Sequence, residues 1–146
     1  MCGVYTLDKT RVVLADDHPF LRAGIRKILD RVPDIDVIGE AGDGFQALNL
    51  VEELAPDLLI LDVEMPGKNG IQVARELHAD DSHVRILVLS AYDNGPHIRG
   101  MFEAGVAGYL TKDEVPEVLV KAIRGIMRGS KRWVSDRVAA KLPPSD

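Results

Sequence analysis

The feature that most constrains the fold is a regular alternation of short apolar runs with longer amphipathic stretches. Three of the short runs are apolar at consecutive positions, which is typical of strands covered by helices on both faces. A parallel sheet with helices on both sides is therefore favoured. Five runs rich in β-branched residues predict its strands: 11–15, 36–40, 58–61, 86–89 and 106–110.

Apolar residues at helical spacing follow each of these runs. Asp113 is expected to cap the last helix, with Pro116 in its first turn. Because parallel strands need right-handed crossovers, the order βαβαβαβαβα predicts a doubly wound, five-stranded α/β fold. The predicted helices cover 21–32, 47–55, 71–77, 95–104 (where the periodicity is weak) and 115–126.

Length and composition exclude several classes of protein. The 146 residues are about the size of one domain, and 46% hydrophobic with 28% charged residues is ordinary for a globular chain. There is no apolar run of membrane-spanning length and no signal peptide. The single cysteine, Cys2, cannot form an internal disulfide, so a cytoplasmic location is expected. A net charge of -5 argues against binding of nucleic acid by this chain alone.

Polar side chains follow four of the predicted strands. Asp16 and Asp17 follow the first strand, Asp62 the third, Ser90 the fourth, and Lys112 lies just beyond the fifth. In a doubly wound sheet, ligands bind beyond the carboxyl ends of the strands, so these side chains are expected to share a cleft. Clustered carboxylates are typical of a Mg²⁺ site, and a nearby lysine and hydroxyl can bind an anion that the metal also holds. These groups suit phosphoryl transfer.

Each of these residues also has an ordinary structural explanation. Asp16 and Asp17 can cap the following helix, and Lys112 can be a solvated side chain. Because these five residues lie at or beside the ends of four different strands, a shared site is favoured over five separate explanations.

Two further patterns resemble known kinds of site but favour ordinary structural roles. Gly42, Gly44 and Ala47 form a G-x-G-x-x-A pattern like a dinucleotide fingerprint. It follows the second strand rather than the first and leaves Lys112 without a role, so the glycines are interpreted as a tight turn. The four histidines lack the spacing of a zinc site, and His18 is expected to orient the loop beside the acidic pair.

Four segments together resemble the receiver domain of bacterial response regulators. They agree with that family in order and spacing over roughly residues 10 to 130, and two of them look most like the NarL/FixJ (LuxR-type) subgroup. The resemblance implies a flavodoxin-like fold with strand order 2-1-3-4-5. The segments are ADDHPFLRAGIRKIL, PDLLILDVEMPGKNGIQVAREL, LVLSAY and AGVAGYLTKDEVPEVLVKAI.

The resemblance assigns roles to individual residues around the acidic group. Asp62 would be the phosphoacceptor, forming an acyl phosphate from a kinase phosphohistidine. Asp17 and Asp62 would bind Mg²⁺ with their carboxylates, and Asp16 would hold it through water. The backbone carbonyl of Glu64 would be a further ligand.

The resemblance also assigns a switch. Lys112 would pair with one phosphoryl oxygen, and Ser90 would donate its hydroxyl to another. Tyr109 would turn inward once Ser90 is drawn to the phosphoryl group. Glu64 and Tyr92 occupy positions that the family uses to tune the lifetime of the phosphoryl group.

The chain is accordingly divided into an N-terminal extension (1–9), a receiver domain (10–130) and a tail or start of an interdomain linker (131–146). The tail is expected to form a short helix or a linker, with Trp133 as a packing anchor.

We predict a self-phosphorylating switch rather than an enzyme. A sensor histidine kinase would be the donor, a phosphorylation-dependent homodimer is a candidate assembly, and DNA would be bound only through an output domain outside this chain. No membrane partner is expected. One alternative is a stand-alone receiver that acts through protein contacts. The other is a small Mg²⁺-dependent phosphatase or nucleotide-binding enzyme, which needs a substrate-sized pocket that the short loops do not predict.

Overall fold

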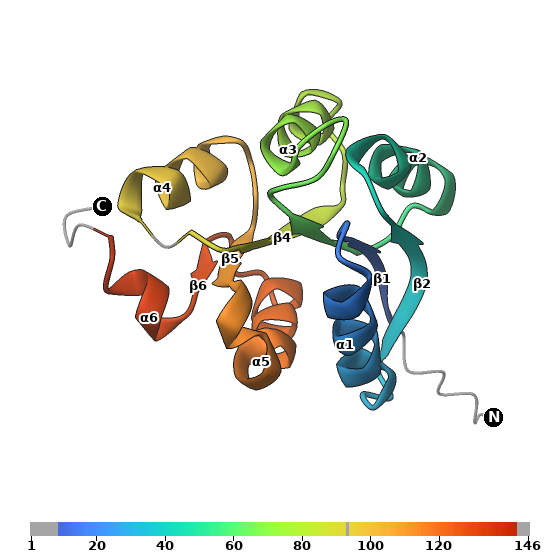
Figure 1. Ribbon diagram of the computed structural model, residues 1–146, viewed down its shortest axis with the longest axis horizontal. Helices are drawn as coiled ribbons and strands as arrows, with labels where there is room; N and C mark the ends of the chain where they lie inside the picture. The colour runs from blue at the N-terminus through green and yellow to red at the C-terminus, as the bar shows by residue number, and fades with distance from the viewer. Residues whose placement is uncertain (1–8, 93, 143–146) are drawn as a thin grey trace.

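Six parallel strands form one sheet in the order β2-β1-β3-β4-β5-β6 (Figure 1). The computed structural model describes residues 9–92 and 94–142. The first five strands have the predicted order, so the doubly wound fold is confirmed, with one strand more than predicted. The strands are β1 (Thr10–Ala15), β2 (Ile35–Ala41), β3 (Leu58–Asp62), β4 (Arg85–Ser90), β5 (Gly108–Thr111) and β6 (Trp133–Val134).

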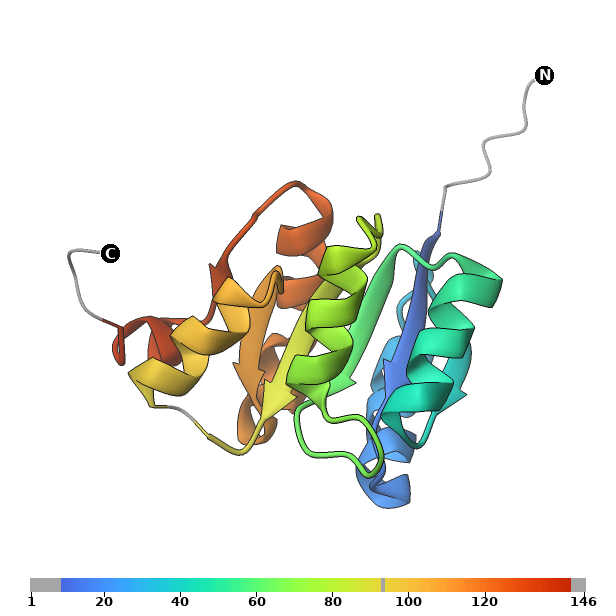
Figure 2. The same cartoon turned by 90° about the horizontal axis from the view of Figure 1, so that it is seen from above.

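Helices cover both faces of the sheet and give two apolar layers (Figure 1). Helices α1 (Pro19–Asp30) and α5 (Val115–Met127) pack on one face. Helices α2 (Gly44–Leu54), α3 (Gly70–Ala79) and α4 (Gly95–Glu103) pack on the other. Figure 2 shows that the strands run to the same edge of the sheet. Within the described residues, no helix is long and apolar enough to cross a bilayer.

The weakly periodic segment 95–104 does form a helix, α4. The side chain of Asn94 accepts a hydrogen bond from the backbone N–H of His97, and Pro96 occupies the first turn. These two signals set the start of the helix where the apolar periodicity alone is ambiguous.

The tail folds back onto the sheet as β6 and the short helix α6 (Asp136–Ala139). Strand β6 pairs in parallel with β5, which the sequence analysis did not predict. Trp133 packs against Gly125 of α5, where a Cβ would lie 2.5 Å from the indole Cδ1. The prediction that Trp133 is a packing anchor is confirmed, and this contact holds β6 against the sheet.

The prediction that Asp113 caps α5 was wrong. A 3₁₀ turn, η1 (Lys112–Glu114), lies between β5 and α5, and the residue at the N-cap of α5 is Glu114. The carboxylate of Asp113 accepts a hydrogen bond from Thr111 Oγ1 at 2.7 Å and forms an ion pair with Arg137 at 2.7 Å. Asp113 therefore links the end of β5 to α6. Pro116 does lie in the first turn of α5, as predicted.

The first residue of α2, Gly44, has to be a glycine because the loop after β3 passes directly over it. A Cβ at Gly44 would lie 2.1 Å from the carbonyl oxygen of Lys68, a backbone atom. Lys68 in turn precedes Asn69, whose capping box fixes the start of α3. Gly44 thus serves a close approach in this turn, as interpreted from the sequence, whereas a Cβ at Gly42 would meet only the side chains of Arg22 and Gln46, at 3.4 Å or more.

We expect Gly44→Ala to lower the free energy of unfolding by about 1–3 kcal/mol, because the new methyl group forces backbone apart. Gly24→Ala is the matched control, since a Cβ on the exposed face of α1 meets nothing within 4 Å. That change should raise the free energy of unfolding by about 0.5–1 kcal/mol. Urea denaturation of the three proteins measures both effects. Equal stability of the two variants would contradict the close approach.

Candidate functional site

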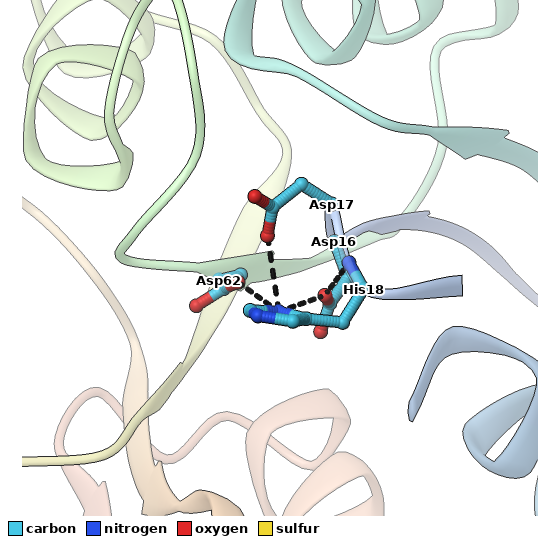
Figure 3. A group of neighbouring side chains, drawn as sticks. All are labelled: Asp16, Asp17, His18 and Asp62. Carbon is cyan, nitrogen blue, oxygen red and sulfur yellow. Dashed lines mark hydrogen bonds and ion pairs between the residues drawn. The ribbon is translucent and has the colours of Figure 1, made fainter. Parts of the chain in front are cut away.

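Loops at the carboxyl edge of the sheet bring the predicted acidic residues together. Asp16 and Asp17 follow β1, and Asp62 ends β3, its parallel neighbour. One carboxylate oxygen from each of them and a ring nitrogen of His18 all lie within 4.8 Å of one another (Figure 3). Lys112, the first residue after β5, places its Nζ 3.0 Å from Asp62 Oδ1. The predicted grouping of the three carboxylates and the lysine is therefore observed.

The site is buried at its centre and open at its rim. The side chains of Asp16 and Asp62 are 0% and 1% exposed, whereas Asp17 and Lys112 are 31% and 22% exposed. The apolar strand residues that precede Asp16 and Asp62 lie in the core, so the backbone fixes both carboxylates in place.

Burial and crowding raise the pKa of Asp62. Desolvation is the largest cause, and the charge of Asp16 adds to it. The hydrogen bond and charge of Lys112 act in the opposite direction, as does the backbone N–H of Glu64, which donates to Asp62 Oδ1 at 3.2 Å. The net direction is upward, so the ionised form of Asp62 is held at a cost in free energy.

Three buried carboxylate oxygens have no hydrogen-bond partner within the described part of the chain. They are Asp16 Oδ2, Asp17 Oδ1 and Asp62 Oδ2. Buried charges of one sign are costly unless a counter-charge compensates them, and carboxylate oxygens are the ligands of hard divalent cations. The residues present therefore fit a metal ion, and this acidic group could hold one.

His18 was predicted to orient the loop beside the acidic pair, and the structure also places its ring inside the acidic group, next to Asp62. Its backbone N–H donates to Asp16 Oδ1 at 2.7 Å, a local turn that shapes the loop after β1. Its ring Nδ1 faces the three carboxylates (Figure 3). The adjacency of a histidine to two aspartates at a strand end was the available signal.

Ser90 ends β4 and belongs to a second, neighbouring network. Its Oγ accepts a hydrogen bond from the backbone N–H of Tyr92 at 3.0 Å and lies 3.3 Å from His97 Nε2. The hydroxyl of Tyr109 donates to the carbonyl oxygen of Tyr92 at 2.5 Å. Tyr109 is fully buried and packs edge-on against the ring of His97, with centroids 5.9 Å apart.

Two consequences follow for the expected switch. Tyr109 already occupies an inward position here, and its rotation stays a prediction. His97 connects Ser90 to Tyr109, although no sequence motif marked it; burial lowers its pKa. A hydrogen bond to Glu64 raises the pKa of Tyr92, so the two positions expected to tune the phosphoryl lifetime are in contact.

A cleft of about 800 Å³ opens beside the acidic group. Asp17 and His18 line one side, and Glu64 and His97 lie farther along it. The expectation that short loops leave no substrate-sized space was wrong, because the loop after β3 and the start of α4 stand apart and form the two walls.

Comparison with known proteins decides the family. Residues 12–124 match the response regulator receiver domain. The chain belongs to this family. The receiver domain is 39% identical over 128 residues to the nitrate/nitrite response regulator protein NarP of Escherichia coli K12, which covers 88% of this chain and 59% of the relative. It is 40% identical over 118 residues to NarL of the same strain, with 81% and 55% covered. The chain thus spans little more than half the length of these relatives.

Solved structures agree with this assignment. A LuxR-family two-component response regulator from Aurantimonas sp. SI85-9A1 is 35% identical, with a TM-score of 0.86 over 92% of this chain and 95% of that one. The signal receiver domain of the putative NarL of Mycobacterium tuberculosis is 38% identical, with a TM-score of 0.80 over 84% and 98%. The predicted resemblance to NarL/FixJ-type receiver domains is confirmed.

At pH 7 in EDTA, we expect Asp62→Asn to raise the free energy of unfolding of the receiver domain by about 1 kcal/mol. A carboxyl group with a raised pKa binds its proton more tightly in the folded state than in the unfolded chain. Stability is therefore lost as the pH rises from the ordinary value of 3.8 through the raised pKa. The extra stability of the Asp62→Asn variant should vanish at lower pH, where Asp62 of the wild type is protonated and as neutral as the asparagine.

The matched control is Asp36→Asn on β2, where the side chain is exposed. It removes the same charge and should change the free energy of unfolding by less than about 0.5 kcal/mol. Thermal unfolding across the pH range measures both variants. A destabilised Asp62→Asn variant would mean that the pairing with Lys112 outweighs the burial.

Proposed function

We propose that this receiver domain is a phosphorylation switch in which Asp62 is the phosphoacceptor. A carboxylate oxygen of Asp62 attacks phosphorus, the phosphorus–nitrogen bond of a phosphohistidine breaks, and the histidine leaves with the electron pair. The observation that carries this is the burial of Asp62 between the Lys112 ammonium and two further carboxylates.

The resident cation is proposed to be Mg²⁺. The carboxylates of Asp17 and Asp62 would bind it, Asp16 would hold it through water, and the backbone carbonyl of Glu64 would be a further ligand. The bound ion supplies neutralisation of the phosphoryl oxygens during transfer. The three orphaned carboxylate oxygens support this choice.

Lys112 and Ser90 are proposed to bind the transferred group. The Lys112 ammonium already contacts Asp62 Oδ1, so it is within reach of a phosphoryl oxygen attached at this carboxylate. Ser90 has one hydroxyl hydrogen, so donating it to a phosphoryl oxygen requires that it is not given to His97. Such a change would alter the network that holds Tyr109, which supports the proposed switch role of Tyr109.

The partners are inferred from the relatives. A sensor histidine kinase would be the phosphodonor, and the output would be transcriptional, through a DNA-binding domain outside this chain. A solved structure of RcsB, 28% identical to this chain, contains two dimers bound to two parallel DNAs, which supports a homodimer here; that phosphorylation drives it is part of the proposal. We place the receiver domain in the cytoplasm and extend it from residue 10 through α6, because β6 and α6 pack on the sheet; residues 1–9 would be an extension, and any linker would begin after α6. It would be a switch rather than an enzyme.

A second candidate is a small phosphatase that uses the same group. The cleft of about 800 Å³ beside Asp17 is large enough for a small phosphoester. Continuous release of phosphate from p-nitrophenyl phosphate, many turnovers per chain, would favour this candidate. A stand-alone receiver would differ from a transcription factor in lacking a DNA-binding domain encoded after this receiver domain, so the sequence of the gene distinguishes the two.

We expect incubation with acetyl phosphate and Mg²⁺ to add one phosphoryl group to the protein, seen by intact-protein mass spectrometry. Asp62→Asn should abolish the adduct, and Asp36→Asn should leave it unchanged. Lys112→Met should slow its formation by about 100-fold or more, because a charge that stabilises the transition state is removed. An adduct that persists in Asp62→Asn would overturn the assignment of the phosphoacceptor.

A further inference from the structure

We propose that His18 makes the acidic group a site for a first-row transition-metal ion, bound through one imidazole nitrogen together with carboxylate oxygens. The inference rests on the proposed phosphorylation site, because it concerns the same carboxylates. It adds a fourth ligand and a metal class that an all-oxygen Mg²⁺ site does not have.

The hydrogen-bond balance of the group requires a cation. The ring nitrogen Nδ1 of His18 can donate one hydrogen at most. Its position allows a hydrogen bond to Asp16 Oδ1, 3.3 Å away. Asp17 Oδ1 lies closer, at 3.0 Å, yet it makes no hydrogen bond. One N–H therefore cannot compensate the three unpartnered carboxylate oxygens, whereas a divalent ion among them can be held by all three carboxylates, with Asp16 acting through water.

The distances within the group match those between ligands that share one ion. Ligands at right angles around an ion with bonds of about 2.1 Å are about 3.0 Å apart, and tetrahedral ligands are about 3.4 Å apart. His18 Nδ1 lies 3.0 Å from Asp17 Oδ1, 3.3 Å from Asp16 Oδ1 and 3.7 Å from Asp62 Oδ2 (Figure 3). Only the last distance has to shorten by a few tenths of an ångström.

The surroundings hold these ligands in place and leave the right atoms available. Lys112 and the N–H of Glu64 both bind Oδ1 of Asp62, so its Oδ2 remains for a metal. The backbone N–H of His18 donates to Asp16, and Pro19 begins α1 directly after it, so the backbone that carries the ring is restrained. The His18 side chain is 58% exposed and lines the cleft, which provides an entry path.

The ligand set predicts selectivity. Imidazole is a good ligand for Co²⁺, Ni²⁺ and Zn²⁺, whereas Mg²⁺ prefers oxygen ligands and water. His18 should therefore contribute strongly to the binding of a transition-metal ion and little to the binding of Mg²⁺. The competing interpretation is that the ring is only a counter-charge to the carboxylates and leaves when any cation binds.

The test is titration of the whole chain with Co²⁺ and, separately, with Mg²⁺, in wild type and His18→Gln, by isothermal calorimetry. We expect Co²⁺ affinity to fall at least 10-fold in His18→Gln and Mg²⁺ affinity to change less than 3-fold, typical of losing one imidazole ligand. The Gln variant keeps the backbone N–H that binds Asp16, so the loop is preserved. His83→Gln, an exposed site before β4 at the opposite edge of the sheet, is the matched control.

A spectroscopic readout is independent of affinity. Pulsed electron paramagnetic resonance of bound Mn²⁺ should show coupling to one nitrogen nucleus in wild type and in His83→Gln, and none in His18→Gln. Unchanged Co²⁺ affinity in His18→Gln, or no nitrogen coupling in wild type, would overturn the proposal and leave the ring as a counter-charge.

Failure of the proposed function is distinguished by a separate measurement. If wild type forms no phosphoryl adduct but the Co²⁺ affinity still depends on His18, the switch chemistry fails and the metal site stands. If the adduct forms and the metal affinities do not depend on His18, only the metal inference fails.

Discussion

The constraint on which the site depends is the burial of two like charges, Asp16 and Asp62, at the ends of adjacent parallel strands. Neither carboxylate can retreat into water, because the strand residues before each one are locked in the core. Lys112 compensates only one oxygen of Asp62. The folded protein therefore has a concentrated negative potential at this point, which a bound cation neutralises. Burial of the two charges lowers the stability of the cation-free protein and favours cation binding.

Parallel topology makes this arrangement possible. The strands run to the same edge, so four separate segments of the chain deliver one or two side chains each to that edge. The helices on both faces exclude water from the strands but not from the loops beyond them. The same geometry separates two tasks: the acidic group sits over β1 and β3, while the network of Ser90, His97 and Tyr109 sits over β4 and β5.

The features that the sequence predicted well are local. The doubly wound parallel sheet follows from apolar runs and crossover rules, and its strand order from the family resemblance. The meeting of Asp16, Asp62 and Lys112 follows from their positions just beyond the strands. Helix α4 was the least periodic segment, yet its Asn94 cap and Pro96 were readable in the sequence.

The features that the sequence did not predict depend on contacts between distant segments. Strand β6 is two residues long and forms because the indole ring of Trp133 packs against Gly125 of α5. Asp113 turns away from the helix that it precedes because Thr111 and Arg137 lie within reach. The cleft beside His18 arises from the spacing of the loop after β3 and α4, which no single segment determines.

The short tail carries a consequence for the dynamics of the molecule. Strand β6 and α6 are only two and four residues long, yet Val138 of α6 is fully buried in the same apolar layer as Tyr109. Elements this small open at a lower free energy than a central strand. Amide protons of α6 should therefore exchange with solvent through brief detachments that leave β1, β3 and β4 intact. Each detachment would uncover the layer around Tyr109, so the slowest motion of the aromatic ring would be governed by a segment almost thirty residues farther along the chain.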